Sequence, residues 1–73
     1  MRMMHRGVEL HLVVDPADGV FFATVVMTWP TGVDRQAQVQ EFGPFASIIQ
    51  AITEGTLQAR AWADLVLDAG ILS

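Results

Sequence analysis

Residues 8–29, VELHLVVDPADGVFFATVVMTW, contain two apolar segments separated by a turn sequence. In the first segment, residues 8–14, apolar residues alternate with others, as in a strand that is buried on one face. The linking DPADG combines proline, aspartate and glycine, each of which favours a turn for its own conformational reason. The second segment, residues 20–29, is rich in β-branched and aromatic residues. The stretch therefore predicts an antiparallel hairpin whose first strand has an apolar face made of Val8, Leu10, Leu12 and Val14.

A third strand is expected at residues 33–42, after a second turn at PTG, residues 30–32. If Asp15 lies opposite Val20 and Trp29 lies opposite Val33, one face of the sheet is apolar on all three strands. A slip of one residue would move the apolar side chains of one strand to the other face. That all three strands have their apolar residues on one face therefore supports the register. The sequence thus predicts a three-stranded antiparallel meander in the order 1-2-3.

The other face of this predicted sheet is a candidate binding surface. It has an apolar centre and polar flanks, and its third strand carries glutamine at alternate positions. Amides donate and accept hydrogen bonds at once and suit a recognition surface, although they also keep an edge strand soluble. The candidate interface residues on this face are His11, Phe22, Val26, Gln36, Gln38 and Gln40.

A helical region is expected after the sheet. The sequence GPF at residues 43–45 predicts the end of the strand and a helix with Pro44 in its first turn. Gly55 either ends this helix, with Thr56 capping a second one, or lies inside one long helix and lets its backbone approach the sheet. The expected fold is a single α+β domain over residues 1–73, in the order β-β-β-α(-α), with one or two C-terminal helices on the apolar face.

The last helical segment has more apolar surface than one sheet covers. Its polar residues Arg60, Asp64 and Asp68 form one narrow stripe, read as solvated, and an apolar arc of roughly 200° is left, about twice the arc that packs on a sheet. Ordinary core packing accounts for such an arc in some small domains. An interface is the favoured reading, because large uncovered apolar surface marks one. The candidate interface residues here are Trp62, Leu65, Val66 and Leu67, and they predict a homodimer.

Composition narrows the range of partners. The chain has 73 residues, no cysteine, 52% hydrophobic residues and only 16% charged residues. A domain of this size buries roughly 60% of its unfolded surface, and with disulfides excluded, binding to itself or to another protein is the remaining source of stability. The net charge of −4, with four arginines and no lysine, argues against nucleic acid as a partner. A helix-turn-helix is also not expected, because Asp64 and Asp68 would lie on its recognition helix and bring negative charge to the phosphates of DNA.

No membrane association is expected from the sequence. The apolar run Val20–Trp29 is far shorter than the ~20 residues that span a bilayer, and Glu9 and His11 interrupt the region where a signal peptide would have its apolar core. The chain is therefore predicted to be cytoplasmic. Its richness in alanine and valine, with no lysine, asparagine, tyrosine or cysteine, suggests a bacterial or phage origin.

The sequence contains no constellation that predicts catalysis, a metal site or a cofactor. Glu9 and His11 would share one sheet face, but a metal site needs three or four convergent ligands. Asp15 and Asp18 fit turn chemistry better than a calcium loop, which requires a later glycine and a terminal glutamate. Ser47 has no histidine near it in the predicted fold. The protein is therefore expected not to be an enzyme.

The order of elements resembles that of the small antitoxin domains of the HicB type. The matching features are an aspartate-glycine turn, an aromatic strand, a proline-glycine turn and a glycine that opens the helical region, over roughly residues 8–54. The residues that carry them are Asp18-Gly19, Phe21-Phe22, Pro30, Gly32, Gly43 and Ala51. The resemblance implies a non-enzymatic protein that covers a toxin ribonuclease.

Size, acidity and the lack of catalytic groups favour a protein-binding module. The expected function is that of a small inhibitor that covers a partner protein, either antitoxin-like or phage-encoded against a host defence. The alternative is a structural subunit that associates with itself in a phage or bacterial assembly.

Overall fold

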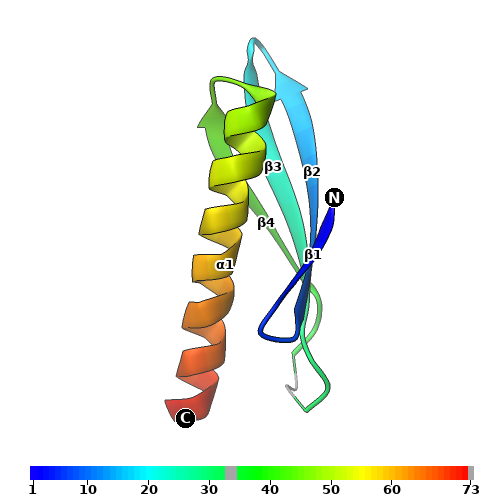
Figure 1. Ribbon diagram of the computed structural model, residues 1–73, viewed down its shortest axis with the longest axis vertical. Coiled ribbons are helices and arrows are strands. Elements are labelled where there is room, and N and C mark those ends of the chain that lie inside the picture. Colours follow the sequence, from blue (N-terminus) through cyan, green and yellow to red (C-terminus); the bar gives the residue numbers. More distant parts are fainter. Residues whose placement is uncertain (33–34, 73) are drawn as a thin grey trace.

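The computed structural model describes residues 1–32 and 35–72, with side chains described up to residue 69. In this part of the chain the elements are β1 (Arg2–His5), β2 (Val8–Ala17), β3 (Val20–Thr28), β4 (Gln38–Phe45) and α1 (Ile48–Leu72). The strands form one antiparallel sheet in the order β1-β2-β3-β4, and α1 covers one face of it (Figure 1). The α+β class is confirmed, while the expectation of three strands is wrong because there are four.

The additional strand, β1, lies at the edge of the sheet beside β2. It is joined to β2 by a two-residue turn in which Arg6 has φ 52° and Gly7 has φ 82°. Two positive φ values match the twist of a tight hairpin, but arginine is an unusual residue at the first of them. The pairing continues to Met1, whose carbonyl accepts from the Leu12 N–H at 2.8 Å.

The turn between β2 and β3 is tighter than expected. Ala17 lies opposite Val20, so the turn consists of Asp18 (φ 50°) and Gly19 (φ 82°) alone. Consequently Leu12 lies opposite Val25 instead of Ala23, an offset of two residues from the expected register. Because side chains alternate with period two, this offset leaves every residue of β2 and β3 on the expected face.

The pairing of β3 with β4 differs from the expected register by three residues. Ala23 lies opposite Phe42 and Val25 opposite Gln40, so β4 starts later than the predicted strand and uses the opposite parity. The expected pairing of Trp29 with Val33 lies outside the described residues. The expected register would have placed Ala37 and Val39 on the core side. The observed register places Phe42 there instead, and this buries more apolar area.

The helix begins later than expected, because GPF belongs to β4. Pro44 lies in the strand, and α1 starts after Ser47. The Ser47 hydroxyl accepts from the Gln50 N–H at 3.1 Å, and the Gln50 side-chain oxygen accepts from the Ala46 N–H at 2.9 Å. This reciprocal arrangement satisfies backbone donors that have no partner inside the helix, and it defines the helix start.

Gly55 lies within one continuous helix, as the second of the two alternatives proposed. An added Cβ at Gly55 would come 2.6 Å from the Ala23 Cβ, so the backbone of α1 approaches β3 closely here. The Thr56 hydroxyl donates to the Ile52 carbonyl at 2.6 Å and does not cap a second helix. The stripe that faces the sheet consists of the small buried residues Ala51, Gly55, Ala59 and Ala63.

The core lies between α1 and the inner face of the sheet. Its most deeply buried large side chains come from β2 and β3, and the small residues of α1 close over them. None of the helices described is long and apolar enough to cross a membrane. The buried apolar residues are Val8, Leu10, Leu12, Ala23, Val25, Met27, Trp29, Phe45, Ala51, Ala59 and Ala63.

Candidate protein-binding surface

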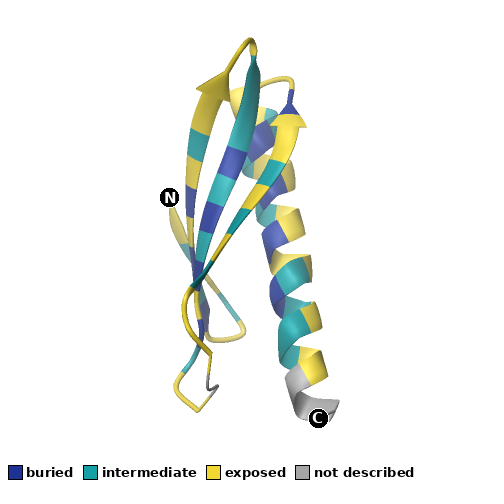
Figure 2. Cartoon of the chain, turned by 180° about the vertical axis from the view of Figure 1, so that it is seen from behind, coloured by how far each residue is buried: buried dark blue, intermediate teal, exposed yellow. Residues whose placement is uncertain are grey.

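The face of the sheet that points away from α1, here called the outer face, has no layer over it among the described residues. Figure 2 shows it from the front, with the helix behind the sheet. The strand registers assign its side chains, because residues that pair directly point to the same side of a sheet. The outer face is formed by Arg2, Met4, Glu9, His11, Val13, Asp15, Ala17, Val20, Phe22, Thr24, Val26, Thr28, Val39 and Glu41.

The centre of the outer face is apolar and partly open to solvent. Val26 of β3 lies between His11 of β2 and Val39 of β4. Val39 is 61% exposed and Val13 is 48% exposed, whereas Phe22 and Val26 are half-buried by their neighbours in the sheet. Exposed apolar side chains on an open sheet face make it a candidate for contact with another protein.

Charged groups flank this apolar centre. The guanidinium of Arg2 lies 3.5 Å from a carboxylate oxygen of Glu9. The carboxylate of Asp15 accepts a hydrogen bond from the Thr24 hydroxyl at 3.0 Å. Glu41 is exposed, and no described basic group pairs with it or with Asp15. The outer face therefore has two carboxylates that no described basic group neutralises.

The glutamines do not share this surface as expected. Gln38 and Gln40 lie opposite Met27 and Val25, so they point to the side of α1, and Gln36 precedes β4 and is exposed. The side-chain oxygen of Gln38 is buried without a hydrogen-bond partner among the described residues. Of the six residues predicted for this face, His11, Phe22 and Val26 are on it. Val39 and Glu41 occupy the positions that the glutamines were expected to fill.

The residues predicted as an interface on α1 lie in the other layer of the molecule. Trp62, Val66 and Leu67 are half-buried against the core, which accounts for most of the excess apolar arc. Leu65 remains 68% exposed. The structure therefore does not combine these four residues with the outer face into one surface.

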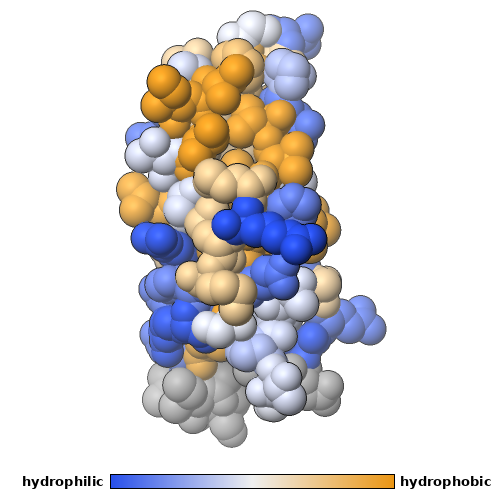
Figure 3. Space-filling view, turned by 45° about the vertical axis from the view of Figure 1, so that its right-hand side comes forward, coloured by the Kyte–Doolittle hydropathy of each residue, from blue (hydrophilic) through white to orange (hydrophobic). Residues whose placement is uncertain are grey.

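A second apolar patch lies at the start of α1. Ile48 is 53% exposed and Ile49 is 78% exposed. Figure 3 shows apolar side chains gathered in the upper half of that view, where α1 begins, and mostly hydrophilic ones below them. The sequence did not predict this patch.

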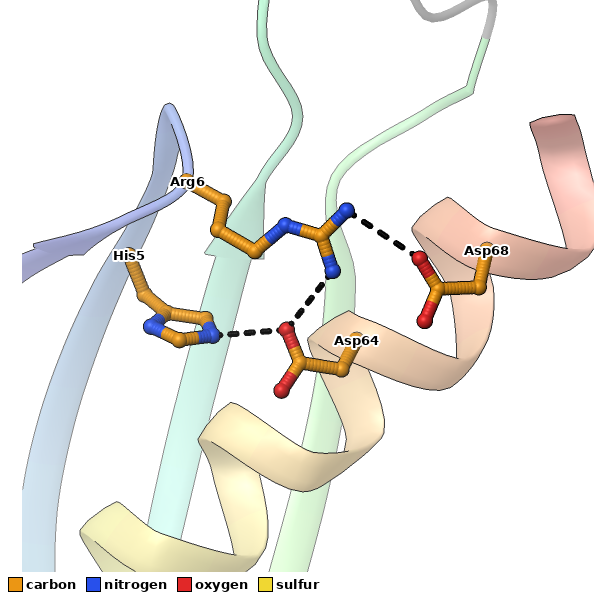
Figure 4. Close-up of polar contacts among 4 residues, drawn as sticks. All are labelled: His5, Arg6, Asp64 and Asp68. Atoms are coloured by element: carbon orange, nitrogen blue, oxygen red, sulfur yellow. Dashed lines mark hydrogen bonds and ion pairs between the residues drawn. The ribbon is translucent and has the colours of Figure 1, made fainter.

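A polar cluster joins the β1–β2 turn to the second half of α1 (Figure 4). The His5 Nε2 lies 2.8 Å from the Asp64 Oδ1, and the Arg6 guanidinium donates to the same oxygen at 3.0 Å and to Asp68 Oδ1 at 3.1 Å. The hydrogen bond with His5, followed by that with Arg6, lowers the pKa of Asp64. The hydrogen bonds to Asp64 and then Asp68 raise the pKa of Arg6.

This cluster was missed by sequence reasoning, which treated Asp64 and Asp68 as a solvated stripe with Arg60. The histidine–carboxylate pair has no hydroxyl nucleophile hydrogen-bonded to it among the described residues, and Arg6 shares the carboxylate. The cluster thus holds the hairpin against the helix. No group of three or more side chains suited to a metal ion occurs in the part of the chain that the structure describes.

Comparison with known proteins does not assign this surface a role. No protein-family model, no curated protein and no solved structure matches the chain. The function of the outer face is therefore inferred from its own geometry and chemistry.

Proposed function

We propose that the protein is a non-enzymatic binding module, a small inhibitor that acts by covering a partner protein with its outer face. The observation that carries this proposal is the open apolar centre of that face, where Val13 and Val39 are about half exposed or more. In a two-layer domain, one sheet face is buried by the helix and the other is free to bind. Covering a partner requires no catalytic group on this chain.

The size of the outer face is at the minimum for a biological interface. The four strands contain 4, 10, 9 and 8 residues, and at ~3.3 Å per residue and about 4.8 Å between strands they present roughly 500 Å². Burying that area on both partners removes about 1,000 Å² of surface from solvent, which is the minimum for a biological interface and falls in the size class of weak or transient complexes. The resemblance to HicB-type domains, which cover a toxin, is in keeping with this mode of action.

The alternative, a self-associating structural subunit, is favoured by the patch at the start of α1. Ile48 and Ile49 are exposed, and their neighbours Ser47 and Gln50 are uncharged. Two copies can meet at such a patch without bringing like charges together. Self-association there would leave the outer face uncovered.

Site-specific photocrosslinking in host cells distinguishes these proposals. A benzophenone amino acid is placed at Val39 on the outer face, at Ile49 on the second patch, and at the exposed helical residue Thr53 as the matched control. The inhibitor proposal predicts a crosslink from Val39 to one different protein and none from Thr53. Crosslinks from Ile49 to a second copy, with none from Val39, would support the structural subunit and contradict the inhibitor.

A further inference from the structure

We propose that the surface bound by the outer face is basic as well as apolar, and that a lysine or arginine of the partner lies over Phe22 between Asp15 and Glu41. This inference rests on the proposed function, because it names the chemistry of the protein that the outer face covers. Three features of the outer face support it: the position of the Phe22 ring, the placement of the two carboxylates and the distribution of arginine.

Phe22 is the aromatic side chain of the outer face. Its ring lies against Gly43, where an added Cβ would come 3.1 Å from the ring carbon Cδ1. Because Gly43 has no side chain, the ring packs directly on the backbone there, and Phe22 is left half-buried instead of fully covered. An accessible ring face attracts a cation, most strongly when the contact is shielded from water.

The two carboxylates lie on either side of this ring along the sheet. Asp15 is directly opposite Phe22 on β2. Glu41 on β4 is directly opposite Thr24, the next outward residue of β3. A positive side chain over Phe22 therefore has an acceptor on each flank, and charge-assisted hydrogen bonds of this kind are shorter and stronger than neutral ones.

No basic residue of this chain occupies that position. Among the described residues, the outer face carries three carboxylates (Glu9, Asp15, Glu41) and one guanidinium (Arg2), a net charge of −2 with His11 neutral, and Arg2 is paired with Glu9. The sequence has no arginine or lysine between residues 7 and 34 or between 36 and 59. The remaining arginines lie elsewhere: Arg6 at the α1 aspartates, Arg35 with its guanidinium carbon 5.4 Å from the centroid of the Trp29 ring, and Arg60 exposed on α1.

The same charges oppose a second copy as the occupant of the outer face. Two outer faces stacked on each other would place the carboxylates of both copies in one contact, and like charges brought together at an interface cost free energy. A partner with basic side chains among apolar ones satisfies both the apolar centre and the acidic flanks. The outer face is therefore suited to a partner of opposite charge.

The test is an NMR titration of isotopically labelled protein with a short peptide in which lysine alternates with valine. The matched probe replaces each lysine with glutamate. The expected result is that the lysine peptide shifts the ring signals of Phe22 and the methyl signals of Val26 and Val39, that salt weakens this binding, and that the glutamate peptide leaves these signals unchanged. Glu41→Gln should weaken binding about two- to fivefold, and Glu54→Gln, on the exposed side of α1, should not change it.

Equal binding of both peptides, shifts confined to α1, or no binding at millimolar lysine peptide would overturn the inference. Failure of the proposed function gives a different result. If Val39 crosslinks to a protein whose contacting surface is acidic or uncharged, the inhibitor proposal stands and the inference of a basic partner is wrong. If Val39 crosslinks to no other protein, the proposed function itself fails.

Discussion

Gly55 is the residue at which α1 and the sheet come closest. An added Cβ would be 2.6 Å from the Cβ of Ala23, and 3.4 Å from the Cδ1 of Leu12. Alanine is preferred over glycine inside a helix by about 1 kcal/mol, so propensity alone favours replacing it. Packing against β3 therefore explains the glycine. In a substitution by alanine, the gain in helix propensity and the cost of the steric contact with Ala23 have opposite signs.

The Gly55→Ala substitution is expected to destabilise the protein by about 1–3 kcal/mol, because overpacking outweighs the gain in propensity. Urea unfolding followed by circular dichroism measures the change. The control is Ala61→Gly at an exposed position of α1, which should cost about 1 kcal/mol through propensity alone. A Gly55→Ala protein more stable than the wild type would contradict the close approach of helix and sheet.

The contacts of Asp64 predict that the free energy of unfolding depends on pH. Hydrogen bonds with His5 and Arg6 lower its pKa in the folded protein below the ordinary value of 3.8. The unfolded chain therefore takes up the proton first, and the stabilisation by Asp64, present above pH 3.8, is lost as the pH falls through the folded pKa. In Asp64→Asn this loss should be absent.

The measurement compares the free energy of unfolding of wild type and Asp64→Asn between about pH 5 and pH 3. The two curves are expected to converge as the pH falls. Protonation of Asp64 removes the stabilisation by its carboxylate, which the substitution by asparagine has already removed. Glu54→Gln, on the exposed side of α1, serves as the control. A constant gap between wild type and Asp64→Asn throughout this range would show that Asp64 is not held as described.

At the scale of elements, β2, β3 and the helix could be predicted, because their apolar periodicity is long and turn residues bound them. β1 could not, since it has four residues and its turn uses Arg6 in a conformation that arginine seldom adopts. The register of β4 also could not. The alternating glutamines predict a strand from residue 33 with Ala37 and Val39 on the core side. The structure instead has Phe42 and Phe45 on that side, with a register shift between Phe21 and Ala23 that allows both to reach the core.

An engineered disulfide tests this register, and the chain has no cysteine to interfere. Val26 and Val39 are directly opposite in the structure, whereas the register expected from sequence places Gln36 opposite Val26. Directly opposed residues of antiparallel strands have Cα atoms about 4.5–5.5 Å apart, within the range of a disulfide. The double variant Val26→Cys, Val39→Cys should therefore oxidise readily to a monomeric disulfide.

The matched control is Val26→Cys, Gln36→Cys, which should stay reduced or form mixtures under the same conditions. Mass spectrometry after alkylation of free thiols distinguishes the two states. Rapid oxidation of the control, with the Val39 variant remaining reduced, would show that the glutamine face points outward and that the observed pairing is wrong.

At the scale of the whole molecule, the outer face was half predictable from sequence. Three of its residues were predicted: His11, Phe22 and Val26. They lie on the expected face because an even offset between β2 and β3 leaves the alternation of side chains unchanged. The presence of Val39 and Glu41 on this face was not predicted, because it depends on the pairing of β3 with β4, which no local signal specifies. The Phe22–Gly43 contact and the cluster of Figure 4 arise only when distant segments meet, so no pattern in the sequence indicates them.

The central claim is that the outer face, and not the exposed side of α1, contacts the partner protein. The most direct measurement is the affinity of the photocrosslinked partner for Val13→Lys, Val39→Lys, compared by calorimetry with Leu57→Lys, Leu65→Lys on α1. All four residues are exposed, so folding should be affected little. Burial of an unsatisfied neutral polar group costs about 1–3 kcal/mol, and burial of an unpaired charge costs more. The outer-face variant should therefore bind at least roughly 30-fold more weakly, and the α1 variant as tightly as wild type. Full affinity in the Val13, Val39 variant, with binding lost in the Leu57, Leu65 variant, would contradict the claim.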